Sequence, residues 1–99
     1  MSAGEALQYH LEQRGWSQKD LSDVTGRPAS ALNQMIKGSK DITRETATQL
    51  AAALDTTPEY WLRLQDEYKL WLLEQRPGWK DMLAAVRSNA RLKNDVKQR

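Results

Sequence analysis

Apolar side chains recur every three or four positions along most of the chain, and this period places them on one face of a helix. Glycine and proline interrupt the pattern and divide it into short segments. The pattern predicts six helices, over residues 4–14, 18–25, 29–37, 44–54, 58–76 and 79–93. We therefore expect an all-α fold.

The two helices predicted between Ser17 and Gly38 have the clearest start and stop signals. Ser17 can cap the first of them, because its hydroxyl can accept a hydrogen bond from the backbone N–H of Asp20. Gly26 can end that helix, since glycine takes the left-handed conformation without steric cost. Pro28 cannot continue a helix but is suited to opening the next one. The sequence therefore predicts two short helices joined by a tight turn.

The second of these helices has one apolar face and one face without acidic residues. At about 100° per residue, its apolar side chains gather around Leu32. The opposite face carries Ser30, Asn33, Gln34 and Lys37. Amide side chains can make paired hydrogen bonds to adenine in the major groove, and Lys favours phosphate or guanine. This helix alone supports DNA reading and an ordinary solvated surface equally well.

The longer run LSDVTGRPASALNQMIKGSKDITRETATQLAAALDTTPEYWLRLQ resembles the helix-turn-helix domain of the Cro/C1 or XRE family of repressors. With GWSQKDL ahead of it and a proline, an aromatic pair and LxLQ near its end, it looks most similar to the HigA group of toxin–antitoxin antidotes. The resemblance covers roughly residues 4–75. It implies a lambda-repressor-like domain of five helices, in which the second and third read DNA, and a dimer on a palindromic operator.

Position by position, the resemblance also implies roles for side chains of the reading unit. Family positions that contact base edges are matched by Ser30, Asn33 and Gln34. Family positions that meet the DNA backbone are matched by Gln18, Lys37 and Lys40. The base-reading face inferred from the helical period and the one implied by the resemblance are therefore the same.

Two arginines beside the reading unit are further candidates for phosphate contacts. Arg27 lies in the turn between the two short helices. Arg44 falls in the first turn of the following helix, where an acidic residue would suit the helix dipole better. A DNA phosphate near that helix end would account for Arg44.

The helix predicted over residues 58–76 is longer than one core stripe requires. Its second half is apolar on more than one side, because Leu70, Trp71 and Leu73 lie off the ridge that Leu72 continues. Either the C-terminal segment folds back over these side chains, or they form a dimer or partner surface. The sequence leaves both alternatives open.

Beyond this helix, Pro77 and Gly78 mark a boundary. We predict a helix-turn-helix DNA-binding domain over residues 1–76, and an additional C-terminal helix with a basic tail over residues 77–99. The last residues, from Arg91, are polar and basic, so we expect them to fray or to be disordered.

Charge is distributed unevenly along the chain, although the formal net charge is only +2. Residues 14–44 contain six Lys or Arg and three Asp, and residues 77–99 contain six Lys or Arg and two Asp. Residues 45–76 reverse this balance, with three bases and six acids. Positive charge on the reading unit and the tail favours a phosphate partner and predicts salt-dependent binding.

Other function classes lack their motifs here. The chain has no glycine-rich phosphate loop, HExxH motif or nucleophile elbow, so we do not expect an enzyme. It has no cysteine and a single histidine, His10, which we interpret as a packed or half-exposed bystander, so we expect no metal or cofactor. No apolar run reaches the length of a membrane span and no signal segment opens the chain, so we expect a cytoplasmic protein without a membrane partner.

Two functions from different classes follow. The first is a sequence-specific transcriptional repressor that binds double-stranded operator DNA as a homodimer and, as the family resemblance implies, acts as the antitoxin of its own operon. The second is a protein-interaction module that neutralises a cognate toxin, with DNA binding secondary. The chain could also be the DNA-binding part of a larger regulator, because the resemblance identifies the reading unit and not its partner.

Overall fold

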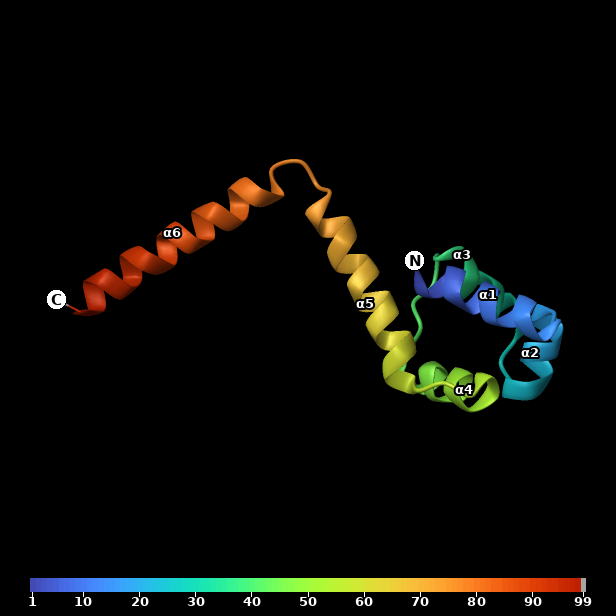
Figure 1. Cartoon of the computed structure of the whole chain (residues 1–99). Helices are drawn as coiled ribbons and strands as arrows, with labels where there is room; N and C mark the ends of the chain where they lie inside the picture. Colours follow the sequence, from blue (N-terminus) through green and yellow to red (C-terminus); the bar gives the residue numbers. More distant parts are fainter. Residues whose placement is uncertain (99) are drawn as a thin grey trace. The chain divides into compact units, whose positions relative to one another are not determined.

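The computed structural model describes residues 1–98, with side chains up to Val96, and this part of the chain contains helices and no strands. The helices, drawn in Figure 1, are α1 (Ala3–Arg14), α2 (Gln18–Thr25), α3 (Ala29–Lys37), α4 (Arg44–Leu54), α5 (Pro58–Glu74) and α6 (Trp79–Gln98). The chain divides within α5 into two compact units. The N-terminal unit is Met1–Tyr68, and the C-terminal unit begins at Lys69.

The predicted all-α fold is confirmed, and the bounds of α2, α3 and α4 agree with the sequence prediction. Their ends are set by local chemistry. Ser17 accepts from the backbone N–H of Asp20, whose carboxylate accepts from the backbone N–H of Ser17. Gly26 and Gly38 end α2 and α3 with φ of 79° and 81°.

The prediction for the last residues was wrong within the described part of the chain. We expected fraying from Arg91, but α6 continues to Gln98, while Arg99 lies outside the described residues. No glycine or proline occurs between Trp79 and Gln98 to stop the helix. The division into domains at residues 76 and 77 stays a prediction.

The core of the N-terminal unit lies between α1, α2, α3, α4 and the start of α5. Its largest fully buried apolar side chains are Leu7, Leu11, Leu21, Leu32, Leu50, Leu54 and Trp61. Helix α1 packs on α3, and α2 packs on both α3 and α4. Burying each such side chain stabilises the fold by about 1.5–3 kcal/mol, so this core holds the two short helices in place.

Gly4 lets α1 approach the backbone at the end of α3. A Cβ atom built on Gly4 would lie 2.3 Å from the carbonyl oxygen of Ile36 and 2.6 Å from that of Met35. These are backbone atoms, which cannot rotate away as a flexible side chain would. Glycine is therefore required here for packing, although its φ is not in the left-handed region.

Gln65 of α5 holds the loop between α3 and α4. Its side-chain carbonyl accepts from the backbone N–H of Ile42 at 2.7 Å, and its amide donates to the Ile42 carbonyl at 3.0 Å. The side chain of Ile42 is buried, with 3% exposed. Since unpaired backbone groups in such a place would be costly, this pair of bonds stabilises the position of the loop against α5.

His10 joins α1 to the start of α5. Its Nε2 lies 2.9 Å from the hydroxyl of Tyr60, and its ring packs edge-on against Tyr60 and Trp61. Arg14 lies 3.4 Å from His10 Nδ1 and also donates to the Leu54 carbonyl at 2.7 Å. Because Arg14 can only donate, Nδ1 must accept, which places the imidazole proton on Nε2. His10 is half-buried and takes part in packing, as expected for a packed or half-exposed residue.

Burial, with a smaller contribution from the charge of Arg14, lowers the pKa of His10 below its ordinary value of 6.5. The fold therefore favours the neutral imidazole. Above pH 6.5 the histidine is neutral in both the folded and the unfolded chain, and its contribution to stability is fully present. As the pH falls below that value, the unfolded chain takes up a proton first, and stability is lost.

We predict that Gly4→Ala destabilises the fold although alanine is the better helix former. The helix preference would favour alanine by about 1 kcal/mol, but the added Cβ forces α1 away from α3, and overpacking of this kind costs about 1–3 kcal/mol. Urea unfolding should show a net loss. The exposed Gln13→Ala on the same helix is the control and should change stability little. A Gly4→Ala variant at least as stable as the wild type would show that the contact is not close.

We also predict that stability decreases as the pH is lowered through 6.5, and that part of this decrease depends on His10. His10→Gln keeps an amide that can donate to Tyr60 but does not titrate. Urea unfolding at a series of pH values should therefore give a smaller decrease for His10→Gln than for the wild type. Identical pH profiles for the two proteins would contradict the assignment.

Candidate nucleic-acid interface

The rotation of α3 about its axis is determined by two buried side chains. Leu32 is 0% and Met35 3% exposed, so the side of the helix that carries them faces the core. Ser30, Gln34 and Lys37 are exposed. The face predicted to read bases therefore stands clear of the N-terminal unit, except at Asn33.

Asn33 is half-buried because it is linked to the start of α2. The side-chain amide of Gln18 donates to the side-chain carbonyl of Asn33 at 3.4 Å. The bond leaves the amide group of Asn33 and the carbonyl of Gln18 for other partners. The sequence placed these two residues in separate roles, as a base contact and a phosphate contact, and did not predict that they meet.

Several hydrogen bonds to the backbone carbonyl of Gln34 hold the C-terminal end of α3. Gln34 accepts through its backbone carbonyl from the hydroxyl of Ser39 at 3.2 Å and from the backbone N–H groups of Ser39 at 3.0 Å and Lys40 at 3.3 Å. Lys37 and Lys40 are both exposed. Two cations thus lie at the same end of α3, one on the helix and one in a short, tied loop.

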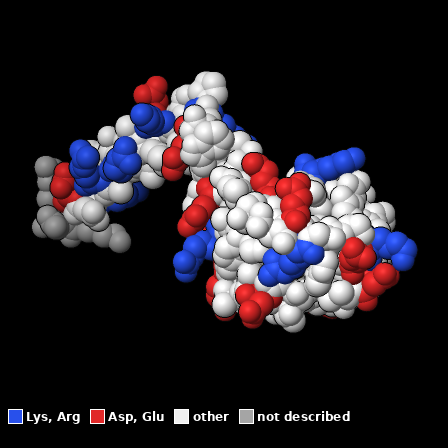
Figure 2. All heavy atoms as spheres, turned by 45° about the vertical axis from the view of Figure 1, so that its right-hand side comes forward, with Lys and Arg blue, Asp and Glu red and all other residues white. Residues whose placement is uncertain are grey.

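Acidic residues are absent from α3, and those of α2 are engaged elsewhere. Asp20 accepts from the Ser17 backbone N–H at 2.8 Å, and Asp23 pairs with Lys19 at 3.3 Å. On the face of the N-terminal unit visible in Figure 2, acids and bases are interspersed. Because α3 carries only amides, a hydroxyl and a cation on its exposed face, it lacks the repulsion that carboxylates would exert on DNA.

The turn between α2 and α3 is fixed by side-chain hydrogen bonds to the backbone. The hydroxyl of Ser22 donates to the Arg27 carbonyl, and the Arg27 N–H donates to the hydroxyl of Thr25 at 3.2 Å. Thr25 in turn donates to the Leu21 carbonyl at 2.8 Å. Pro28 supplies no side-chain cap at the start of α3. The hydrogen bonds of Ser22 and Thr25 therefore hold the turn and the angle between the two helices.

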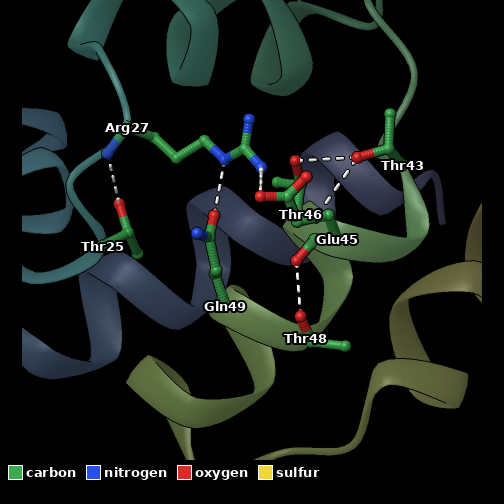
Figure 3. A network of polar contacts seen from close by, with 7 residues as sticks. All are labelled: Thr25, Arg27, Thr43, Glu45, Thr46, Thr48 and Gln49. Carbon is green, nitrogen blue, oxygen red and sulfur yellow. Dashed lines mark hydrogen bonds and ion pairs between the residues drawn. The ribbon is translucent and has the colours of Figure 1, made fainter.

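Arg27 also connects the turn to α4. Figure 3 shows its guanidinium directed toward Gln49 and Glu45, with Nε donating to the Gln49 side chain and a terminal nitrogen 3.4 Å from the Glu45 carboxylate. The Arg27 side chain is 26% exposed and that of Glu45 78%. A phosphate contact by Arg27 stays a prediction, and the structure adds a positioning role that the sequence did not reveal.

Arg44 is exposed in the first turn of α4. Thr43 caps this helix by accepting from the Thr46 backbone N–H at 3.2 Å, and Glu45 follows as the acidic residue of the first turn. The cap is made by Thr43, and the exposed side chain of Arg44 lies beside it at the surface. Its contact with phosphate stays a prediction.

The described residues offer no support for a metal centre or a membrane span. No three histidine, cysteine, aspartate or glutamate side chains among them are placed to hold a metal ion. None of the helices in residues 1–98 is long and apolar enough to cross a bilayer.

Comparison with known sequences shows that the N-terminal unit is a helix-turn-helix domain. The sequence model of the helix-turn-helix family matches residues 7–61, which is more than half of the chain. A protein of Haemophilus influenzae described as an uncharacterized HTH-type transcriptional regulator is 37% identical over 87 residues, spanning 87% of this chain and 81% of that protein. Antitoxin HigA-1 of Vibrio cholerae is 38% identical over 72 residues, spanning 72% of this chain and 68% of the relative.

Two solved structures of antitoxins are also similar to this chain. An addiction module antidote protein of the HigA family from Coxiella burnetii has a TM-score of 0.74 and 32% identity, covering 81% of this chain and 88% of that one. Antitoxin GraA has a TM-score of 0.75 and 29% identity, covering 83% of this chain and 89% of that one.

Proposed function

The chain belongs to the XRE-type helix-turn-helix family and resembles its HigA-type antitoxins, and on that premise we propose that it is an antitoxin that binds a palindromic operator as a homodimer and represses its own operon. The observation that carries this proposal is the exposed, acid-free face of α3, held outward by the burial of Leu32 and Met35.

In this proposal α3 enters the major groove. Ser30, Asn33 and Gln34 contact base edges, since amides suit adenine and a hydroxyl can serve as donor or acceptor. The hydrogen bond from Gln18 orients the Asn33 amide before DNA arrives, so less rotational freedom is lost on binding.

Phosphate contacts position α3 on the duplex without reading sequence. They are assigned to Gln18, Arg27, Lys37, Lys40 and Arg44. One terminal nitrogen of Arg27 lies 3.4 Å from the exposed carboxylate of Glu45, and a phosphate could replace this carboxylate because ion pairs at the surface are weak. During this exchange, the hydrogen bond to Gln49 would keep the guanidinium of Arg27 oriented.

One reading unit buries roughly 600–1,000 Å², which is little for high specificity. Two units about 34 Å apart could occupy successive major grooves. We assign the dimer contact to Leu70, Trp71 and Leu73 in the C-terminal unit, where Leu70 is 51% and Trp71 52% exposed. Large apolar side chains exposed to this extent and next to each other favour a protein partner.

A toxin is the second candidate for this surface. The relatives named as antitoxins support it, and so do the further exposed apolar side chains Leu72, Met82 and Val86 of the C-terminal unit. In that case neutralisation of the toxin would be the main function and DNA binding secondary. Co-purification with the product of the neighbouring gene distinguishes the two candidates.

We predict that base and phosphate contacts respond differently to truncation. Gln34→Ala should weaken binding to DNA from upstream of the protein's own gene by about 1–3 kcal/mol and leave binding to random DNA unchanged. Lys40→Ala should weaken both alike and reduce the salt dependence, because a phosphate is present in every sequence. Band shifts on the two duplexes at two salt concentrations measure both effects. Equal losses on both duplexes for both variants would contradict the assigned roles.

We also predict that the double variant Leu70→Ser, Trp71→Ser is monomeric at micromolar concentration, whereas the wild type is a dimer. Light scattering gives the mass, and operator titrations should lose their cooperative, two-site behaviour in the variant. Val24→Ser is the matched control, since Val24 is 55% exposed on α2 in the other unit. If the wild type is itself a monomer that binds one half-site, the dimer proposal fails.

A further inference from the structure

Helix α6 carries a second cluster of basic side chains, outside the reading unit. At about 100° per residue, Lys80, Arg87 and Arg91 fall within an arc of about 40°. We call these three residues the basic stripe. It runs parallel to the helix axis for about 16 Å, given the rise of 1.5 Å per residue.

The basic stripe is available to a partner. All three side chains are exposed, and Figure 2 shows Lys and Arg side chains gathered along α6. The acids of the same helix, Asp81 and Asp95, form no ion pair with them among the described residues. Asp95 lies about 40° outside the arc, one turn beyond Arg91, and Asp81 lies about 100° from Lys80. The stripe therefore keeps a net positive charge.

We propose that the basic stripe binds the phosphate backbone of duplex DNA, and this inference rests on the proposed function. DNA presents about one negative charge per 1.7 Å of its axis, so a stripe about 16 Å long faces several phosphates. Two of the three cations are arginines, whose planar guanidinium groups can bind phosphate through two hydrogen bonds. The stripe would extend the phosphate contacts of the protein without adding sequence readout.

An anionic membrane is the other polyanion that a basic helix could bind, but the apolar side of α6 does not favour it. The large apolar side chains on one face, Trp79, Met82, Leu83 and Val86, are all in the first half of the helix. In the second half Lys93 falls on that face, and Val96 lies at its edge. Leu92 lies on another side, about 140° from Trp79. A helix that lies in a membrane surface needs an apolar face along its length.

The experiment measures how binding depends on salt for the full chain and a variant with Lys80→Gln, Arg87→Gln and Arg91→Gln. Glutamine removes the charge and retains a good helix preference, and circular dichroism verifies that helix content is unchanged. The probes are two duplexes of equal length, one from upstream of the protein's own gene and one of random sequence. On both, the slope of log K against log salt concentration should become shallower by about 2.7 for each bound protomer.

A matched pair of single variants separates local contact from general charge. Lys80→Gln removes a lysine of the stripe, and Lys93→Gln removes an exposed lysine about 140° away on the same helix. The first should reduce the slope by about 0.9 and the second should not. Equal effects of the two variants would overturn the proposal.

Three other outcomes separate the basic stripe proposal from the proposed function. If the triple variant keeps the wild-type slope while Gln34→Ala still weakens only the upstream duplex, the basic stripe is not a DNA contact and the proposed function stands. If the wild type binds neither duplex, both proposals fail. If the wild type binds phosphatidylserine vesicles through the stripe and duplex binding does not depend on it, the stripe belongs to a membrane contact instead.

Discussion

The close packing of α1 on α3 is the constraint on which the rest of the structure depends. Gly4 leaves room for the backbone carbonyls of Met35 and Ile36, and the side chains of Leu32 and Met35 are buried in the core. With these groups in place, α3 cannot rotate without exposing apolar surface. The polar side of the helix is therefore held outward by packing on its opposite side, and the arrangement needs no contact on the polar face itself.

Hydrogen bonds from side chains to distant elements complete this support. Gln65 holds Ile42, so the loop after α3 is tied to α5, while Arg27 and Gln49 tie the turn before α3 to α4. Both ends of α3 are thus anchored to the body of the N-terminal unit. Such preorganisation lowers the entropy lost when a groove is filled, which supports DNA binding by a small domain.

Local chemistry made much of the fold predictable. Ser17, Gly26 and Gly38 mark helix ends through their own backbone and side chains, and the helical period assigned Ser30, Asn33 and Gln34 to one face. The full length of α6 was missed, because only the absence of a stop signal indicated it. The roles of Gly4 and Gln65 could not be predicted, since each depends on atoms more than twenty positions away in the chain.

Side-chain amide spectra of the protein, recorded by NMR while duplex DNA from upstream of its own gene is added, test the central claim most directly. The amide resonances of Gln34 and Asn33 should shift or broaden at saturation, while that of Gln65, which is bonded to Ile42 inside the protein, should stay unchanged. If the resonances of Gln34 and Asn33 remain in place while the duplex is bound, α3 does not enter the groove and the account is wrong.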